Sequence, residues 1–546
     1  MRDLLSDLRQ TGVNPQNGIG PMGKRTGAVY TPSALAYFLS NWAVRPEARV
    51  LEPSAGDGQF VQAVTATGQA RELYAIELDP SASEVARTRG DGSTITYTGD
   101  FFAWYRSNHY DGTFDAVVGN PPFIRYQNFL EEHREPAFAL MREEGLNPTR
   151  LTNAWLPFVV VATKALREGG RFAMVLPAEL LQVNYARELR EFLAKKYEQL
   201  HIITFRKLLF EGVEQETLLL LGERRDSSDG AEISFTEIED CGALTDQVLR
   251  KSSSVHADIV HARDKWTQFF LSPKEFSLIQ EIEATSPNRL GDYAEVDVGI
   301  VTGRNQFFVV TRRTAADFGL TEQCLPLVGK SAHVKGLLLR EDDWKLLMQA
   351  ETPCLLVQLG PDDRAELSDA GLAYVQMGEA AGYHTGYKCR VRAPNWWNVP
   401  SVWTPDAFMT RQIYDGPRIV VNHTAAVCTD TIHRLRTRPG VDPRQLAAVS
   451  INSLTWAFSE IKGRSYGGGV LELEPREAED LPLPLTPGSR FLDLEELDAA
   501  ARNGEGAIAR DVVDNVVLRE FGLSSNEIKM LKAIWVRLST RRMERR

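Results

Sequence analysis

The sequence predicts an α/β protein with an open sheet in its N-terminal half, followed by a second domain. Three observations support this fold class. Between residues 25 and 225, short apolar runs of strand length alternate with segments of helical apolar spacing. Four successive runs end in polar or acidic residues, at the place where open α/β sheets carry their chemistry. The chain of 546 residues also exceeds one typical hydrophobic core, which indicates two major domains with appendages.

The first predicted helix covers residues 33–43, where apolar residues recur at helical spacing. Thr31 or Ser33 would cap its N-terminus, and Pro32 is tolerated in a first turn. Residues 1–24 contain Gly, Pro and Asn without periodicity, which is typical of an arm or a cover. A helix cap is the simplest interpretation of Thr31.

The first predicted strand, at residues 49–52, runs into a loop of small residues and then into a helix. Small residues such as Ser54 and Ala55 let the backbone approach a cofactor, and the loop opens on a helix N-terminus. Glu52 and Asp57 make this loop acidic, whereas a pyrophosphate-binding loop would be neutral or positive. A carboxylate here favours a cationic ligand group, such as the amino group of a methionine moiety.

The next two strands also end in acids. Residues 72–76 are followed by Glu77, which can accept hydrogen bonds from two ribose hydroxyls, as in dinucleotide folds. Residues 95–98 lead to Asp100 and Phe101, which offer an acceptor for an adenine amino group and a ring to stack on it. Taken alone, each acid is better explained as a turn or cap residue. Four suitable strand ends in succession are much harder to attribute to turns.

The fourth predicted strand, Phe114–Gly119, ends in the tetrapeptide Asn120-Pro121-Pro122-Phe123. Two prolines cannot continue a sheet or enter a helix interior, so the strand stops in a stiff turn. Asn120 offers an amide oxygen, Pro121 offers a backbone carbonyl, and Phe123 offers a flat face. Together they describe a pocket for the exocyclic amino group of a base. A surface turn is the alternative when the tetrapeptide is considered alone.

Composition is ordinary for a globular protein, with 43% hydrophobic and 25% charged residues. The N-terminus is charged, and no apolar run approaches the roughly 20 residues of a membrane helix, so we expect a cytoplasmic protein. The five cysteines are scattered singly, which predicts neither metal sites nor disulfides. A net charge of −11 argues against nonspecific coating of nucleic acid but allows a basic cleft on an acidic body.

The strand-end motifs resemble a known series. VLEPSAGDGQF, AIELDP, GDFF and NPPF, preceded by Tyr-Thr-Pro, are similar in order to the motifs of gamma-class (Taq-type) N6-adenine DNA methyltransferases of restriction-modification systems. The likeness continues through residues 153–158, 169–177, 208–211 and 216–221. It implies a Rossmann-like doubly wound methyltransferase sheet, a C-terminal α+β target-recognition domain, and S-adenosyl-L-methionine as cofactor.

The resemblance also implies roles for individual residues. The methionine part of the cofactor would be held by Thr31 and Glu52 with the loop residues Ser54 and Ala55, the ribose by Glu77, and the adenine by Leu78, Asp100, Phe101 and Phe158. The target base would be gripped by Asn120, which also lies beside the cofactor, and by Pro121, Pro122, Phe123 and Phe210. Phe123 stands where many members have Tyr, but stacking needs only the ring. The implied reaction is site-specific methyl transfer to adenine N6 of double-stranded DNA, after base flipping and without a metal.

We expect an N-terminal arm at residues 1–24, a catalytic domain at 25–262, a target-recognition domain at 263–500, and a basic C-terminal helical segment at 501–546. The polar residues 226–231 are predicted to form a loop between strands. Residues 298–310 resemble the entry to the recognition domain of the same family.

Basic and aromatic residues interleave at residues 383–397, which suits a nucleic-acid face. Core positions are an equally good interpretation for Trp396, Trp397 and Trp403. Residues 464–469 are predicted to be a flexible loop that tracks a DNA backbone or forms a turn. The arginines near the C-terminus add positive charge. The residues expected to contact DNA are Arg125, Arg304, Lys388, Arg390 and Arg392.

Other functions fit parts of the pattern. Ribosomal-RNA guanine-N2 and release-factor glutamine methyltransferases have similar NPPF-type pockets, but their chains are much shorter. Glu460-Ile-Lys462 matches half of a nuclease motif, as a fused restriction-modification enzyme would need, although no suitable Pro-Asp partner precedes it. A noncatalytic DNA-binding module would not need the intact cofactor series. The expected partner is double-stranded DNA, and the sequence does not reveal whether a separate cognate restriction endonuclease accompanies the protein.

Overall fold

The computed structural model describes residues 31–207, 209, 216–226, 229–245, 247–249, 253–257, 265–285, 288–466 and 469–544. The chain divides into two units. The N-terminal unit extends to Phe270 and also includes Glu544, and the C-terminal unit extends from Leu271 to Met543. The expected arm at residues 1–24 and the expected base-packing residue Phe210 lie outside the described residues. Among the helices that are described, none is both long and apolar enough to cross a membrane.

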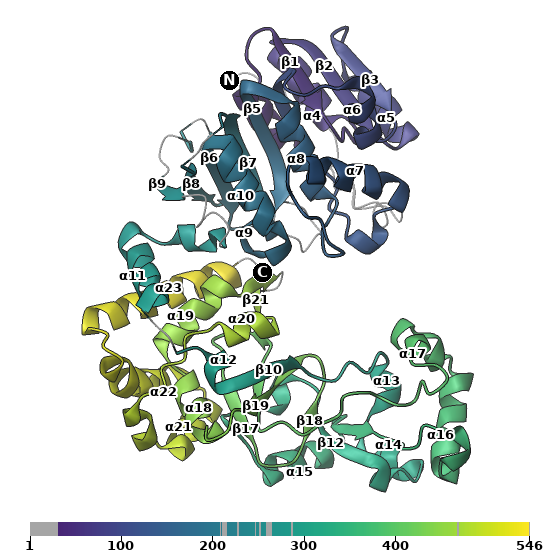
Figure 1. Cartoon of the computed structure of the whole chain (residues 1–546), viewed down its shortest axis with the longest axis vertical. Helices are drawn as coiled ribbons and strands as arrows, with labels where there is room; N and C mark the ends of the chain where they lie inside the picture. Colours follow the sequence, from purple (N-terminus) through teal and green to yellow (C-terminus); the bar gives the residue numbers. More distant parts are fainter. Residues whose placement is uncertain are drawn as a thin grey trace. The chain divides into compact units, whose positions relative to one another are not determined.

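The described residues of the N-terminal unit form a nine-stranded sheet in the order β3-β2-β1-β4-β5-β7-β6-β8-β9 (Figure 1). Neighbouring strands from β3 to β5 are parallel, whereas β7 runs antiparallel between β5 and β6. The chain order reverses between β1 and β4, which is the switch point of a doubly wound sheet. The α/β prediction is confirmed. The strands are β1 Ala48–Glu52, β2 Ala70–Glu77, β3 Thr94–Thr98, β4 Phe114–Gly119, β5 Leu166–Pro177, β6 Tyr197–Phe205, β7 Thr217–Arg224, β8 Ala231–Ile238 and β9 Ser253–Ala257.

Helices of the N-terminal unit pack in two groups. Helices α3, α4 and α5 contact one another, and α6, α7, α8 and α10 form a second contacting series. Helix α8 is buried along nearly all its length, because its sequence WLPFVVVATKA lacks a charged residue before Lys164. The helices are α3 Ser33–Ala43, α4 Gln59–Thr67, α5 Pro80–Arg89, α6 Phe101–Asn108, α7 Glu131–Glu143, α8 Trp155–Ala165, α9 Glu179–Gln182 and α10 Arg187–Lys196, with 3-10 turns at Tyr126–Asn128, Asn184–Ala186, Cys241–Ala243 and Trp266–Phe270.

In the described part of the C-terminal unit, strands form a five-stranded sheet β10-β19-β15-β17-β13, a four-stranded sheet β11-β14-β12-β18, and a three-stranded sheet β16-β21-β20. The bounds in sheet order are Ala294–Val298, Ile432–Thr437, Ala407–Thr410, Ile419–Asn422 and Leu338–Leu339; Val309–Val310, Leu355–Val357, Cys324–Val328 and Val427–Cys428; and Gln412–Ile413, Val470–Glu472 and Arg464–Tyr466. Most neighbouring strands in these sheets are antiparallel, so the C-terminal unit has the predicted α+β character.

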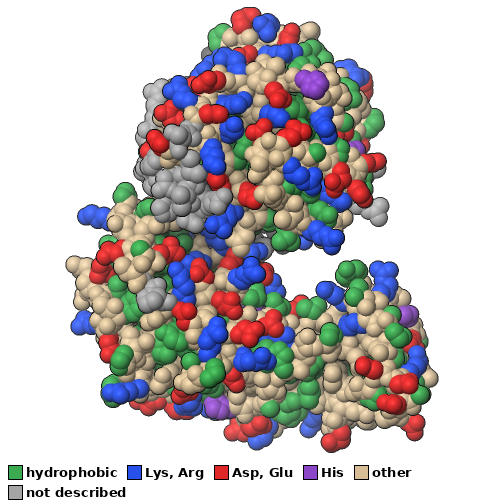
Figure 2. All heavy atoms as spheres, in the orientation of Figure 1, with side chains coloured by type: hydrophobic (Ala, Val, Ile, Leu, Met, Phe, Trp, Pro, Cys, Tyr) green, Lys and Arg blue, Asp and Glu red, His purple; other side chains and the backbone are tan. Residues whose placement is uncertain are grey.

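The helices of the C-terminal unit range from one turn to five. They are α11 Pro273–Thr285, α12 Leu290–Tyr293, α13 Asn305–Phe308, α14 Arg312–Asp317, α15 Glu341–Gln349, α16 Asp369–Ala380, α17 Tyr387–Val391, α18 Pro443–Ser450, α19 Ser453–Lys462, α20 Pro475–Glu479, α21 Leu494–Arg502, α22 Gly506–Val513 and α23 Ser525–Met543. The predicted helical C-terminal segment is thus helical over most of its described residues. On the face shown in Figure 2, acidic and basic side chains are interspersed over each unit.

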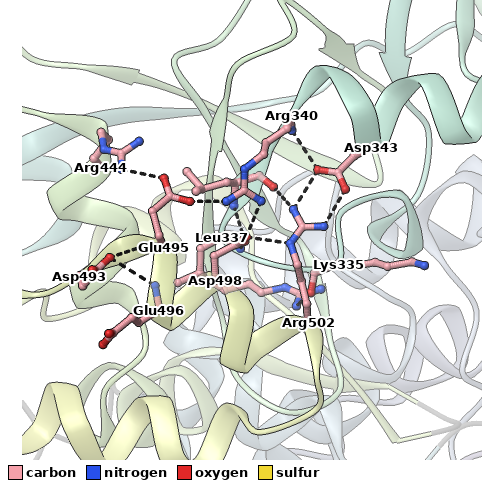
Figure 3. Close-up of polar contacts among 12 residues, drawn as sticks. Lys335, Leu337, Arg340, Asp343, Arg444, Asp493, Glu495, Glu496, Asp498 and Arg502 are labelled. Atoms are coloured by element: carbon pink, nitrogen blue, oxygen red, sulfur yellow. Dashed lines mark hydrogen bonds and ion pairs between the residues drawn. The ribbon is translucent and has the colours of Figure 1, made fainter.

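A buried carboxylate, Asp498, ties β13 and α15 to α21 (Figure 3). Its Oδ1 accepts from the backbone N–H groups of Leu337 and Leu338 at 2.6 and 3.0 Å, while its Oδ2 accepts from Arg340 and Arg502, each at 2.7 Å. Burial opposes ionisation of Asp498, but these donors outweigh burial and lower its pKa. Every lone-pair direction of the carboxylate is therefore used within the fold.

The stretch at residues 383–397 begins with a 3-10 turn at Tyr383–Thr385 and helix α17, and its residues after Val391 form turns. Trp396 and Trp397 are only 4% and 3% exposed, and they join the apolar cluster around Phe307 and Tyr374. Trp403 is partly exposed and lies under the guanidinium groups of Arg434 and Arg436. The core interpretation is therefore correct for two of the three tryptophans.

The loop predicted at residues 464–469 begins instead as strand β20, which pairs with β21. The side chain of Arg464 is partly buried and pairs with Glu477, with Nε to Oε1 at 3.1 Å. Of the C-terminal arginines, Arg542 is buried against Glu460, with Nη2 to Oε1 at 2.6 Å, and Arg537 pairs with Glu275 at 2.6 Å. Carboxylates within the unit thus pair with Arg464, Arg537 and Arg542, so part of the positive charge near the C-terminus is balanced inside the fold.

Candidate active site

Four parallel strand ends place the predicted polar groups on one edge of the sheet. Glu52 is the last residue of β1, Glu77 is the last residue of β2, Asp100 lies two residues after β3, and Asn120 follows the last residue of β4. The β1–β2 and β2–β3 registers pair Glu52 with Ala75 and Glu77 with Thr98. Backbone bonds from Ala55 N to Ile76 O and from Gly99 N to Glu77 O, both 2.8 Å, then connect the loops across the edge.

Glu52 is fully buried. Its Oε1 accepts from the backbone N–H of Ser54 at 3.2 Å, whereas its buried Oε2 has no hydrogen-bond partner among the described residues. Burial raises the pKa of Glu52 well above its ordinary value, and the negative charge of Glu77 adds to the rise. A side chain at Gly119 would place its Cβ 2.6 Å from Glu52 Oε1, so glycine at the end of β4 makes room for this carboxylate. Such a group is suited to bind a cation.

Glu77 organises the loop after β1. Its Oε2 accepts from Gly56 N at 2.7 Å, and its Oε1 accepts from Asp79 N at 2.8 Å. Gly58 has φ of +86°, and a Cβ there would lie 2.7 Å from Ala86 Cα, so the loop requires glycine at this close approach to α5. Leu78 is 52% exposed at the same strand end. The carboxylate thus both shapes the loop and presents oxygens at the edge.

Asp100 caps α6 and faces a histidine that the sequence reasoning missed. Its Oδ1 accepts from Ala103 N at 2.8 Å, and its Oδ2 lies 3.1 Å from Nδ1 of His133 on α7. Burial raises the pKa of Asp100, against the opposing effect of its hydrogen bonds and of His133. No spacing in the sequence links residues 100 and 133, because the contact depends on how α7 packs.

Phe101 and Phe158 stack directly on each other, with ring centroids 5.3 Å apart and an interplanar angle of 13°. Both are buried, at 3% and 7% exposure. A centroid distance in this range, about 4.5–7 Å, is that of two rings in direct contact and leaves no room for a third ring between them. An adenine held between them therefore requires the two rings to separate.

The tetrapeptide after β4 is held from two sides. Asn120 Nδ2 donates to Thr31 Oγ1 at 3.2 Å, and Ser54 Oγ donates to the Asn120 carbonyl oxygen at 3.2 Å. Pro121 is buried, and Phe123 is partly exposed. The expected cap role of Thr31 is wrong, because Pro32 is the N-cap residue of α3 and no side chain caps that helix.

The segment beyond the tetrapeptide leads to a polar cluster that the sequence reasoning also missed. Ala154 N donates to Ile124 O at 2.8 Å, which places the start of α8 beside the turn. The amide of Asn153 donates to Tyr185 Oη at 2.8 Å and to Glu179 Oε2 at 3.2 Å. Arg125 is exposed one residue after Ile124.

The remaining predicted DNA-contacting residues lie in the C-terminal unit. Arg304, Lys388 and Arg390 are exposed. A surface cavity of about 360 Å³ is lined by residues 301–306 and Asp430. Arg392 is used inside the protein: its guanidinium donates to the carbonyl oxygens of Asn398 at 3.0 Å, Lys388 at 3.1 Å and Thr302. Arg392 therefore stabilises the cavity loop through its hydrogen bond to the Thr302 carbonyl oxygen.

The two residues of the half nuclease motif are both engaged in the fold. Glu460 is 7% exposed and pairs with Arg542, and Lys462 pairs with Glu283 at 2.8 Å and with Asp480. Arg542 also donates to the carbonyl oxygens of Tyr414 and Gly469. These side chains join α19, α23 and the β16–β21 pair.

Two family descriptions match the chain. Residues 90–210 match the Eco57I restriction-modification methylase, and residues 263–518 match the C-terminal domain of Type II methyltransferase M.Eco57I. The first range contains Asp100 and the tetrapeptide, and the second contains the cavity loop and α17. The matched residues thus fall in both units.

Individual relatives agree over most of their length. Type II methyltransferase M.XamI of Xanthomonas campestris pv. amaranthicola is 23% identical over 482 residues, covering 85% of this chain and 86% of the relative. Type II methyltransferase M.AccI of Acinetobacter calcoaceticus is 20% identical over 472 residues, covering 83% and 84%. The solved structure of the Type IIL restriction-modification enzyme MmeI in complex with DNA aligns with a TM-score of 0.58 at 11% identity, covering 93% of this chain and 75% of that chain. At that identity the structural likeness concerns the fold alone.

Proposed function

We propose that this chain, which belongs to the Type II restriction-modification DNA methyltransferases, methylates adenine N6. The proposed substrate is a specific sequence of double-stranded DNA, and the proposed cofactor is S-adenosylmethionine. One observation carries this proposal: the buried Glu52 carboxylate, with an oxygen that no described residue satisfies, packs against Gly119 immediately before the Asn120–Phe123 turn. The group proposed to bind a cation and the turn proposed to bind an amine would thus share the switch point of the sheet.

The residues at the edge fit the parts of S-adenosylmethionine. Glu52 Oε2 would accept a hydrogen bond from the methionine ammonium group. Each carboxylate oxygen of Glu77 accepts one backbone hydrogen bond, and its remaining lone pairs would accept from the ribose hydroxyls. Asp100 would accept from the adenine amino group beside the exposed Leu78. When bound, the cofactor supplies an electrophilic methyl group on a sulfonium centre.

The tetrapeptide would activate the target amine. The lone pair of an aromatic amine is delocalised into its ring, which makes the amine a poor nucleophile. Asn120 Oδ1 and the Pro121 carbonyl oxygen would accept its two hydrogens and stabilise the positive charge that develops on nitrogen. Phe123 would stack on the base and, with the two acceptors, hold the nitrogen in line with the methyl group. Neither a metal nor a covalent enzyme intermediate enters this scheme.

A base inside the duplex cannot reach this edge. The adenine would therefore be flipped out of the helix, at a cost of a few kcal/mol that stacking on Phe123 partly offsets. Phe210 stays a predicted packing partner of the base. Arg125 is exposed just after the tetrapeptide and is proposed to contact the DNA near the flipped nucleotide.

Sequence recognition is proposed for the C-terminal unit. Arg304 belongs to the cavity loop, Lys388 packs closely on Gly303 of that loop, and Arg390 is exposed two residues further along α17. Cations on this surface would bind phosphates, and the loop side chains would reach base edges. Arg392, which we expected at the DNA, is better assigned to holding the loop in place.

Methylome sequencing of a host that expresses the protein tests the proposal. We expect N6-methyladenine in one sequence motif, and its absence when Asn120→Ala is expressed. Modification of another base, or methylation of RNA guanine N2 or of release-factor glutamine, would contradict it. Protection of that motif against a separate cognate endonuclease would place the protein in a restriction-modification system.

A further inference from the structure

We infer that the hydroxyl of Thr31 is a positioning group for the Asn120 amide, rather than a helix cap or only a contact to the cofactor. The inference rests on the proposed function of Asn120 and assigns a new role to a residue outside the tetrapeptide. It follows from two hydrogen bonds, one to the side chain of Asn120 and one to its backbone carbonyl.

The first bond fixes the side chain. Asn120 Nδ2 donates to Thr31 Oγ1 at 3.2 Å, so the amide nitrogen faces Thr31 and the amide oxygen lies on the other side of Cγ. An amide rotated by half a turn would present N–H donors to a substrate amine, which is itself a donor. The Thr31 bond therefore holds the plane of the amide, and in this orientation the amide oxygen points away from Thr31 and can accept from the amine.

The second bond fixes the backbone. Ser54 Oγ, on the loop after β1, donates to the Asn120 carbonyl oxygen at 3.2 Å. The side chain is thus tied to the start of α3 and the main chain to the loop that carries Glu52. An amide held at two points from two different elements is preorganised before substrate arrives.

Thr31 is itself held rigidly. It is 7% exposed, and the helix that begins two residues later buries Leu35, Ala36 and Leu39 completely. Helix α3 packs on α4, β4 and β5, so its N-terminus has a fixed position relative to Asn120. Because Pro32 is the N-cap and no side chain caps α3, helix formation does not use the Thr31 hydroxyl.

Three variants of the full-length protein test this inference. Thr31→Val keeps the shape and removes the hydroxyl, Thr31→Ser keeps the hydroxyl, and Thr163→Val is a matched control that removes a buried threonine hydroxyl bonded to Tyr197 at 2.9 Å on α8. We measure kcat under saturating DNA and cofactor, the dissociation constant of S-adenosylmethionine by calorimetry, and base flipping by fluorescence of 2-aminopurine placed at the target position.

We expect Thr31→Val to lower kcat about tenfold to a hundredfold, the scale of a misplaced reacting group. Its cofactor dissociation constant and 2-aminopurine signal should stay within twofold of the wild type, and Thr31→Ser should restore most of kcat. Thr163→Val should leave kcat unchanged, and equal melting temperatures exclude a folding effect.

Two results would overturn the inference. The first is a Thr31→Val variant with wild-type kcat, and the second is a loss that appears mainly as weaker cofactor binding, which would assign Thr31 to the methionine moiety. Asn120→Ala separates this failure from failure of the proposed function. If Asn120→Ala is inactive while Thr31→Val is normal, only the role of Thr31 is wrong; if Asn120→Ala stays active, the proposed function itself fails.

Discussion

Polar residues differ in their bonding between the two units. The comparison is between the strand ends of the N-terminal unit and the arginines on and after α17 and on α23 of the C-terminal unit. At the edge, Glu52 is buried with an oxygen that the described residues leave unsatisfied, and Asn120 is braced by Thr31 and Ser54. In the C-terminal unit, Arg392 and Arg542 are occupied by carbonyl groups and a carboxylate of the same unit.

This difference follows from the length of the side chains. The backbone places a short acid or amide at the end of a parallel strand, so its position follows from the sheet. An arginine reaches much further and binds whichever acceptor the tertiary fold offers, as Arg542 does with a glutamate 82 residues away in the chain. Polar residues at strand ends therefore predict the location of a site more directly than a run of basic residues does.

The largest effect is expected for Asn120→Ala. If this variant kept normal methyl transfer, the strand ends would be structural and would not differ from the C-terminal unit in function. Methyl transfer should fall by at least about a hundredfold to a thousandfold, as when a transition-state hydrogen bond is lost. Cofactor affinity measured by calorimetry should stay within a few-fold. Asn108→Ala on α6, which removes an amide bonded to Trp104 O, is the matched control and should remain active. A large loss of cofactor affinity in Asn120→Ala would mean that the pocket is assigned wrongly.

The second prediction compares how much Arg542 and Arg537 of the C-terminal unit contribute to the free energy of unfolding. Arg542→Gln leaves Glu460 buried without its charged partner and should cost about 3–5 kcal/mol of unfolding free energy. Arg537 lies on the same helix as Arg542 but is half-exposed, so Arg537→Gln, which removes its pair with Glu275 of α11, should cost at most about 1 kcal/mol. Urea unfolding followed by intrinsic fluorescence measures both. Equal losses, or an Arg542 variant that changes only DNA binding, would return these arginines to the DNA surface.

The third effect concerns the charge at the edge. Glu52→Gln should weaken the cofactor by about 1.5–3 kcal/mol, the value of a hydrogen bond to a charged group. Because burial raises the pKa of Glu52 above its ordinary 4.5, binding of a cation should release a proton, and affinity should increase with pH through that raised pKa. Calorimetry in buffers of different ionisation enthalpy measures the proton, and Glu72→Gln on β2 is the control. An unchanged proton release in Glu52→Gln would exclude Glu52 as the cation site.

The same pKa shift predicts an effect of Glu52 on stability without cofactor. The folded-state pKa lies above the unfolded value, so the stability that the protonated group contributes is complete below about 4.5 and is lost as pH rises through the folded pKa. Glu52→Gln cannot ionise and should not show this loss. Cofactor-free Glu52→Gln should therefore melt at a higher temperature than the wild type at neutral pH, and a lower melting temperature would contradict the assignment.

The smallest effects are expected at the DNA surface. If Lys388 and Arg390 bind phosphates, replacing either by Ala should reduce the slope of log affinity against log salt by about one, with little change in sequence preference. Arg392→Ala should instead relax preference among DNA sequences, because it releases the loop at residues 301–306. Filter binding at several salt concentrations distinguishes these results. The opposite pattern would make Arg392 the phosphate ligand.

The sequence was sufficient for the sheet and its polar edge, since strand length, terminating prolines and acids at strand ends are local features. It was not sufficient for His133, which approaches Asp100 only through the packing of α7 on α6. Nor did it predict that Thr31 would contact Asn120, because that hydrogen bond joins residues 89 positions apart. The recognition region was harder still, because neither the burial of Trp396 and Trp397 nor the internal bonds of Arg392 depend on neighbours in sequence.

The close approach of Gly119 to Glu52 has a consequence for how such chains diverge. A Cβ at position 119 would lie 2.6 Å from the Glu52 carboxylate oxygen, so the two positions cannot change independently. A descendant that gains a side chain at 119 must shift the Glu52 carboxylate, and with it the proposed cation site. Among homologues, glycine at 119 and glutamate at 52 should therefore be inherited together, and a chain that has lost both would have kept the sheet while abandoning the cofactor.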